Sequence, residues 1–328
     1  MKKHLPIYAF SLVALVVLPV VSIAVGRYSI SIVDVFSALM GSCEDAVINT
    51  VVFNLRLPRI VTALLVGASL SCAGTAYQGV FQNPLVSPDL LGVSSGSCVG
   101  AALAILLGLG SGTTVAVAFF SGLLCVVLTV FFSNIVGKKS NLVLILAGVI
   151  VGKFMDSIFG GIKYFADAEN ELSEIVYWQM GSVAKVTMER IAYVIPIILI
   201  SLLAMFLLRW RVNLLSIGER DAQSLGVNLS LEKGLIIVFS TILTAASVSV
   251  SGSIGWIGLI IPHISRWLIG SDNKHAIPLS MLLGAIFLLV VDTLARTLTP
   301  LELPLSVLTG IIGTPIFAVI LVKQRRKS

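Results

Sequence analysis

Charged residues are scarce in this sequence. Only 12% of its 328 residues are Asp, Glu, Lys or Arg, while 57% are hydrophobic, and a soluble domain carries roughly a quarter of charged residues. This scarcity excludes an ordinary soluble enzyme. Many of the apolar runs reach about 20 residues, which is enough for a helix to cross ~30 Å of hydrocarbon. The sequence therefore predicts an all-α polytopic membrane protein.

Paired cysteines and catalytic motifs are also missing. No CxxC, HExxH or GxSxG motif occurs, and the three histidines lie far apart. The fragment nearest to a Walker A loop, Gly152-Lys153-Phe154, lacks the Ser or Thr that such a loop requires. Three of the four cysteines lie in apolar runs, where a thiol behaves as a small hydrophobe; the four are Cys43, Cys72, Cys98 and Cys125. We therefore expect no enzyme activity, no metal site and no cofactor.

The apolar runs divide the chain into ten expected membrane spans. The first run is longer than a signal-peptide core of about 7–15 residues and lacks a clear A-x-A site, so it is interpreted as a retained span. The spans lie near 6–25, 57–80, 91–108, 113–136, 141–165, 190–208, 231–251, 254–269, 276–296 and 304–322.

The basic residues indicate how these spans are oriented. The net charge of +6 comes from short basic clusters between apolar runs, which do not form the stripe typical of a nucleic-acid-binding surface. Ten spans put both termini on one side of the membrane. Placing the termini in the cytoplasm gives the inner segments twice as many lysines and arginines as the outer ones, as the positive-inside rule requires. We therefore expect both termini to be cytoplasmic.

Three features inside the apolar segments have more than one interpretation. Small residues recur at helical spacing, for example at Gly67 and Gly74, and this pattern is more typical of close helix packing than of helices that slide during transport. Lys153 and Asp156 lie three residues apart within an expected span, so that they can form an ion pair. Either the pair is structural or it lines a watery pathway. Asp292 and Arg296 have the i, i+4 spacing of a helix-stabilising pair, and the alternative is a role for the arginine on the outer side of the membrane.

Several longer motifs occur in an order that resembles one transporter family. The resemblance extends from about residue 50 to 320, and it is to the FecCD family of permease subunits of ABC importers. The amino-terminal motifs are Arg56-Leu57-Pro58-Arg59, Gly67-Ala68, Gln78, Asn83-Pro84-Leu85, Pro88-Asp89 and Leu91-Gly92-Val93. The later ones are Leu215 through Val227, Gly255-Trp256-Ile257-Gly258-Leu259, Pro262-His263, Arg266, Gly270, Asp272, Pro278, Gly284, Asp292, Arg296, Glu302-Leu303-Pro304 and Gly313-Thr314-Pro315.

The resemblance implies a type II ABC importer permease. Such a subunit has ten transmembrane helices and pairs with a second permease subunit, and the translocation path runs between the two. A soluble binding protein, periplasmic or lipid-anchored, would dock on outward-facing arginines, which correspond here to Arg56, Arg59 and Arg296. Interfacial anchoring is the alternative for the first two arginines, and neutralisation by Asp292 is the alternative for the third.

A separate ATPase subunit would bind on the opposite, cytoplasmic side. The resemblance places the coupling segment within 212–230, although mixed charge at helical spacing is otherwise typical of a solvated face. The positions carried over are Ser216, Gly218, Glu219, Ala222, Leu225 and Gly226. The family lines its path with the second, fifth and tenth spans. Candidate path residues are therefore Lys153, Asp156, Gly160, Gly161, Gly310 and Gly313, with helix packing as the alternative for the glycines.

The motifs do not specify the cargo. A ferric siderophore or related iron chelate is the first expectation, and haem, cobalamin or an oxyanion are alternatives within the family. The competing class is an ion-coupled secondary transporter. Such a transporter would use carboxylates and broken helices in mid-membrane. Only Asp156 with Lys153 approaches that pattern. A membrane-bound enzyme is disfavoured, because no cluster of His, Cys or carboxylate residues is evident. The expected location is the inner membrane of a bacterium.

Overall fold

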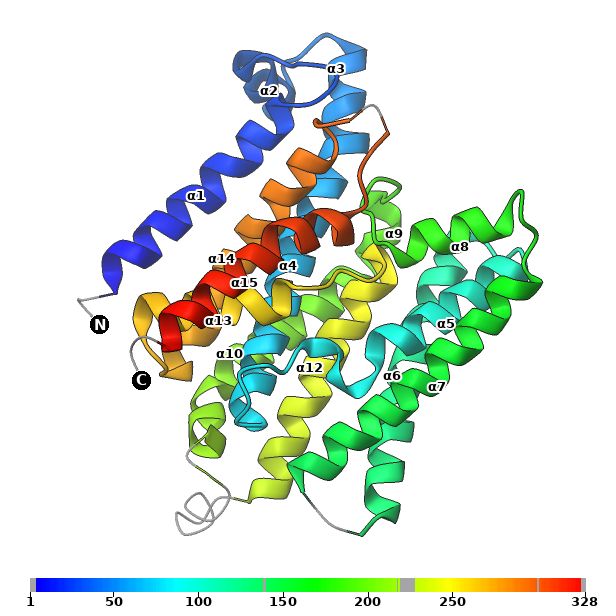
Figure 1. The fold of residues 1–328 in the computed structure, drawn as a ribbon. Coiled ribbons are helices and arrows are strands. Elements are labelled where there is room, and N and C mark those ends of the chain that lie inside the picture. The colour runs from blue at the N-terminus through cyan, green and yellow to red at the C-terminus, as the bar shows by residue number, and fades with distance from the viewer. Residues whose placement is uncertain (1–3, 138–139, 217, 219–227, 300, 326–328) are drawn as a thin grey trace.

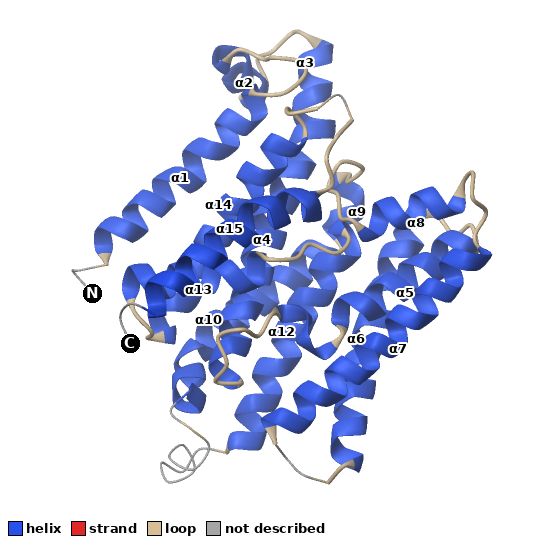
Figure 2. Ribbon diagram, in the orientation of Figure 1, coloured by secondary structure: helices blue, strands red, loops and turns tan. Residues whose placement is uncertain are grey.

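The computed structural model describes residues 4–137, 140–216, 218, 228–299 and 301–325, and every regular element in these ranges is helical (Figures 1 and 2). The first eight elements are α1 (Leu5–Ala24), α2 (Ile32–Leu39), α3 (Ala46–Thr50), the π-helical turn η1 (Val51–Arg56), α4 (Leu57–Val80), the 3-10 turn η2 (Pro88–Leu91), α5 (Val93–Leu106) and α6 (Ser111–Ile135). They are followed by α7 (Asn141–Phe165), α8 (Glu171–Gln179), α9 (Met188–Ala192), α10 (Val194–Ser216), α12 (Leu229–Ser251), α13 (Ile257–Ile269), α14 (Asn273–Ala295) and α15 (Leu305–Arg325).

Seven helices in the described ranges are long and apolar enough to cross a membrane. Three further apolar helices are shorter, namely α5, α13 and the stretch Leu305–Ile320 of α15. A helix occupies each of the ten apolar segments. The seven are α1, the continuous helix Ala46–Val80, α6, α7, the continuous helix Met188–Ser216, α12 and α14.

Helix α4 forms the centre of the bundle. Its membrane-length window is 83% buried, against 17% for α1, and it packs against α14, α12, α13 and α10 (Figure 1). The small residues of α4 make this packing possible. A methyl group on Gly67 would overlap the carbonyl oxygen of Gly284 in α14, and one on Gly74 would overlap that of Gly258 in α13. The packing interpretation of the small-residue pattern is therefore confirmed at these two positions.

The outer helices expose apolar surface. The windows of α6, α7 and α10 are each only 28% buried, and α6 exposes Phe120, Leu124 and Val127. In a soluble protein so large an apolar surface would drive association. On a membrane protein it is the surface that contacts lipid or other subunits.

The start of α1 and the end of α15 lie on the same side of the bundle. The hydroxyl of Tyr8 in α1 donates to the carbonyl of His275 at the start of α14 over 2.8 Å. The ammonium of Lys323, near the end of α15, lies 5.2 Å from the ring centre of Trp267 at the end of α13. Since α13 ends where α14 begins, the start of α1 and the end of α15 are both near the α13–α14 connection. The first turn of α4 and the last turn of α14 lie at the opposite side (Figure 1).

Candidate functional site

The three predicted docking arginines come together at one end of the bundle. Arg56 and Arg59 lie where η1 passes into α4, and Arg296 directly follows α14. All three are buried, with exposed fractions of 6%, 7% and 6%. Their burial differs from the outward-facing arrangement that the family resemblance implies, because the structure engages their guanidinium groups within the chain.

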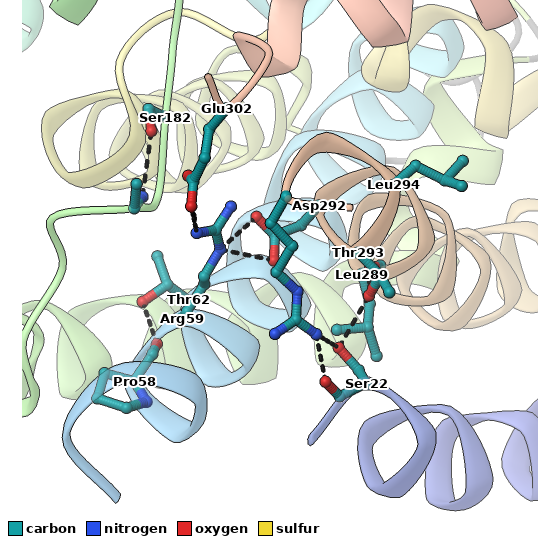
Figure 3. A network of polar contacts seen from close by, with 12 residues as sticks. Ser22, Pro58, Arg59, Thr62, Ser182, Leu289, Asp292, Thr293, Leu294 and Glu302 are labelled. Atoms are coloured by element: carbon teal, nitrogen blue, oxygen red, sulfur yellow. Dashed lines mark hydrogen bonds and ion pairs between the residues drawn. The ribbon is translucent and has the colours of Figure 1, made fainter. Parts of the chain in front are cut away.

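Arg59 is at the centre of a charged network (Figure 3). Its Nε donates to both carboxylate oxygens of Asp292 in α14, over 2.8 and 2.9 Å. Its Nη1 donates to both oxygens of Glu302, over 2.9 and 2.8 Å. Charge-assisted bonds of this kind are among the strongest side-chain hydrogen bonds. Arg59 therefore ties α4 to α14 and to the segment that leads into α15.

Arg56 and Arg296 bind the carboxyl-terminal end of α1. Arg56 donates to the carbonyl oxygens of Ile23, Ala24 and Tyr28. Arg296 donates to the carbonyl oxygen of Ser22 and, over 2.6 Å, to its hydroxyl. The last carbonyls of a helix lack partners in the helix and carry a partial negative charge. The two arginines therefore anchor α1, which otherwise lies at the edge of the bundle.

The side-chain pair between Asp292 and Arg296, one of the two interpretations of their spacing, is not among the ion pairs of the described residues. Asp292 pairs with Arg59, while Arg296 is bonded to Ser22. The i, i+4 spacing allows a pair, but Arg59 approaches Asp292 from α4 and presents its Nε to both oxygens. Glu302, which sequence reasoning quoted only as part of a motif, is the third member of the network. Its side chain is 28% exposed, against 0% for Asp292 and 9% for Arg59.

The predicted ion pair on α7 is formed. Lys153 Nζ lies 3.0 Å from Asp156 Oδ2, and the two side chains are 78% and 47% exposed. The hydroxyl of Ser95, in α5, donates to Asp156 Oδ1 over 2.8 Å. Lys153 lies midway along α7, whose 25 residues otherwise expose mainly apolar side chains such as Ile150 and Phe154. A charged pair is thus exposed in the middle of a span-length helix.

The four glycines proposed for the path fall into two groups. Gly160 and Gly161 are exposed on α7, and a methyl group on either would have no neighbour within 4 Å. These two glycines therefore do not pack against another described helix of this chain. Gly313 is different, because a methyl group there would press against Ile260 and Trp256, while one on Gly310 would make ordinary contact with Trp256. Gly313 serves packing between α13 and α15.

Most of the predicted coupling segment, including Glu219, Ala222, Leu225 and Gly226, lies outside the described residues. Ser216 ends α10, where its hydroxyl donates to the carbonyl of Asn213 over 2.7 Å. Gly218 has a φ of +114°, which favours glycine. The carbonyl of Leu215 accepts a bond of 3.0 Å from the side chain of Gln82. The segment therefore starts next to the far end of α4, opposite the arginines.

A second link fixes the end of α10 to the start of α14. The side-chain amide of Asn213 donates to Asp272 Oδ1 over 2.6 Å, and its oxygen accepts from the Asn273 amide over 2.7 Å. Burial raises the pKa of Asp272, but the hydrogen bonds from Asn213 and from the Lys274 amide lower it, and the net shift is downward. Asp272 therefore stays ionised near neutral pH and caps α14.

An open cavity of about 920 Å³ lies between α13 and α15 on this same side. Among its lining residues are Pro84, Arg266, Trp267, Pro315 and Lys323. His263, also in the lining, is held by a contact of 2.9 Å between its Nε2 and the carbonyl of Pro84. Pro84, His263 and Arg266 belong to motifs in the sequence, but their spacing did not indicate that they meet. Among the described residues, no group of three or more His, Cys, Asp or Glu residues is placed to hold a metal ion.

Comparison with known proteins identifies the family. A model of the FecCD transport family matches residues 14–323. The molybdate import system permease protein MolB of Haemophilus influenzae is 40% identical over 317 residues, which cover 95% of this chain and 94% of that protein. A probable iron chelatin transport system permease protein of Helicobacter pylori is 37% identical over 319 residues, covering 95% and 97%.

The fold comparison agrees with the sequence comparison. A solved structure described as an inward-facing conformation of a putative metal-chelate type ABC transporter superposes with a TM-score of 0.89 at 40% identity, covering 97% of this chain and 99% of that one. The match to the family model and the similarity of the relatives both extend over nearly the whole chain. This chain belongs to the FecCD transport family, whose members are permease subunits of ABC importers.

Proposed function

We propose that this permease pairs with a second permease subunit and that the passage for cargo runs between them, along the exposed face of α7. The observation that carries the proposal is the exposed pair of Lys153 and Asp156 midway along α7. A charged side chain at the centre of a bilayer costs about 2.5–3.5 kcal/mol on insertion scales. This face is therefore better suited to a watery passage than to lipid, and the exposed Gly160 and Gly161 continue it toward the end of the helix that leads to α8.

The cargo in this proposal is a ferric siderophore or related iron chelate. The Helicobacter pylori relative is named for an iron chelatin, and the similar solved structure is described as of metal-chelate type. An oxyanion is the second candidate, because the Haemophilus influenzae relative is named for molybdate at a slightly higher identity. Haem and cobalamin remain further alternatives, since other relatives are named for them.

The binding protein would dock at the end that holds Arg56, Arg59 and Arg296. These arginines are engaged internally, so docking requires an exchange of partners. Glu302 is the network member with the most exposed side chain, at 28%. A carboxylate of the binding protein would replace Glu302 on Arg59, and the segment leading into α15 would be released. Docking would thereby be linked to movement of α15, the tenth expected span, which the family resemblance places along the path.

The ATPase would bind at the opposite end, on the cytoplasmic side of the inner membrane, where both termini would also lie. The support is the position of Ser216 and Gly218 at the start of the proposed coupling segment 212–230, beside the end of α4. Helix α4 extends from this end to the arginine network. It therefore provides a direct mechanical connection between the two docking sites.

Uptake in proteoliposomes tests the proposal. The permease would be reconstituted with its ATPase and binding protein, and uptake of ferric siderophore, molybdate, haem and cobalamin would be compared. We expect uptake of one cargo to require ATP and the loaded binding protein. The matched control is an ATPase variant that binds ATP but does not hydrolyse it. Uptake that follows an ion gradient without ATP would instead favour a secondary transporter that uses Lys153 and Asp156.

A further inference from the structure

The pair of Lys153 and Asp156 does not act as a structural clamp. Both members belong to α7, so their ion pair joins no two helices. Asp156 reaches α5 through the hydroxyl of Ser95, but Lys153 has no such link. Among the described residues, the one hydrogen bond of the Lys153 ammonium is to Asp156, and 78% of its side chain is exposed. An ammonium has three donors, so two remain available.

The carboxylate of Asp156 is fixed on both sides. One oxygen accepts from Lys153 and the other accepts from Ser95, over 3.0 and 2.8 Å. This arrangement holds the lysine ammonium beside a fixed carboxylate. The carboxylate also neutralises the lysine when no ligand is present, which lowers the cost of keeping a cation at this depth.

The surface next to Lys153 leaves space for a ligand. Ser157 is exposed one turn farther along α7, and its hydroxyl is occupied by the carbonyl of Lys153. Gly160 and Gly161 follow at the next turn, with nothing within 4 Å of the position of a side chain. Between Lys153 and Tyr164, which is 84% exposed, this face therefore presents a cation beside a shallow strip without bulky side chains.

We propose that Lys153 is a cargo-contacting residue that recognises negatively charged oxygen atoms, and that the cargo of this permease is anionic. The inference rests on the proposed function, because it needs the face of α7 to border the passage. An oxyanion such as molybdate and an anionic ferric chelate such as ferric citrate both present this chemistry. Cyanocobalamin differs from both because it has no net charge: the charge of its one phosphodiester is balanced at the cobalt centre. Competition with Asp156 keeps the contact weak, as transit through a passage requires.

The first test compares lysine variants in reconstituted transport. K153Q removes the cation, K153R retains it, and K163Q is the control, because Lys163 lies on the same helix but over the ring of Phe159. Uptake of molybdate, ferric citrate and cyanocobalamin would be measured beside the amount of assembled complex. We expect K153Q to lower uptake of the anionic cargo about tenfold, and K153R and K163Q to lower it less than about twofold. The cargo whose uptake falls in K153Q shows whether the permease carries an oxyanion or a chelate.

Equal uptake by K153Q and K163Q would overturn the proposal. So would an equal loss for cyanocobalamin and the anions, since a charge-independent loss indicates a structural role. Intact assembly with the ATPase shows that the variant has folded.

The second test needs neither ATP nor cargo. I150C places a thiol one turn from Lys153, at a position that is 66% exposed. Cys43 would be replaced by serine, and the other three cysteines are buried. The rates of modification by an anionic and a cationic methanethiosulfonate would be compared. We expect K153Q to lower the ratio of the anionic to the cationic rate at least about threefold, and K163Q to leave it unchanged.

An unchanged ratio in K153Q, or a thiol that neither reagent reaches, would overturn the inference. The two tests also separate its failure from that of the proposed function. A ratio that falls as expected, together with uptake that does not need ATP, would leave the anion site standing and would refute the ATP-driven uptake proposed above.

Discussion

For single residues, the ion pairs of Arg59 explain why this predicted docking arginine is buried. Its guanidinium joins Asp292, which is fully buried, to Glu302, which is partly exposed. Breaking a buried ion pair by removing one partner costs about 3–5 kcal/mol, whereas a partly exposed pair contributes about 1 kcal/mol or less. The two carboxylates therefore have different roles. Asp292 stabilises the fold, and Glu302 is the exchangeable partner.

This difference gives a stability prediction. We expect D292N to lower the free energy of unfolding by about 3 kcal/mol and E302Q by less than about 1 kcal/mol. Thermal unfolding of the purified permease in detergent measures both. Equal losses in the two variants would contradict the assignment of roles.

The E302Q variant also tests the exchange of partners at Arg59. E302Q weakens the internal competitor for Arg59, so the binding protein should dock more tightly to E302Q than to the unmodified permease. The affinity of the loaded binding protein for the permease in nanodiscs would show this. Weaker docking to E302Q would mean that Glu302 does not compete for Arg59.

Among the helices, α4 has small residues that let α14 and α13 pack closely against it. Gly67 and Gly74 face backbone carbonyl groups of α14 and α13, so even one methyl group would force these helices apart. Overpacking of this kind costs about 1–3 kcal/mol. The glycines of α4 therefore determine how closely α14 and α13 approach it. Helix α4 in turn connects the two ends of the bundle.

G74A is the variant that tests this packing, and G234A is its matched control. Gly234 is a helical residue of α12 with nothing within 4 Å of the position of a methyl group. We expect G74A to destabilise the permease by about 1–3 kcal/mol, and G234A to be neutral or to stabilise it by up to about 1 kcal/mol through helix propensity. Comparable unfolding of the two variants would show that α4 is not closely packed in the membrane.

At the scale of the whole molecule, the sequence predicted local features and missed distant ones. The helices in the ten apolar segments could be predicted, because each segment is a single long run. The pair of Lys153 and Asp156 could be predicted, because one helical turn joins them. The partner of Asp292 could not, since Arg59 is 233 residues away in the chain and Arg296 offered a nearer alternative. The burial of the arginines likewise depends on where α1 ends in three dimensions.

For the assembled transporter, we propose that α7 borders a watery passage and that the exposed face of α6 contacts lipid. The two helices have equally exposed apolar faces, with 28% of each window buried, but only α7 has an exposed ion pair midway along it. If this is so, thiol reagents should have different access to α7 and α6, although composition alone does not distinguish the two helices.

Thiol accessibility in the assembled transporter tests this claim most directly. Single cysteines would be placed on α7 by I150C, S157C and G161C, and on α6 by F120C, L124C and V127C; all six native residues are exposed. A membrane-impermeant thiol reagent would be applied, with ATP and vanadate in a parallel sample. We expect the α7 positions to react and the α6 positions not to react. Equal reactivity on both helices, or reaction on α6 alone, would contradict it.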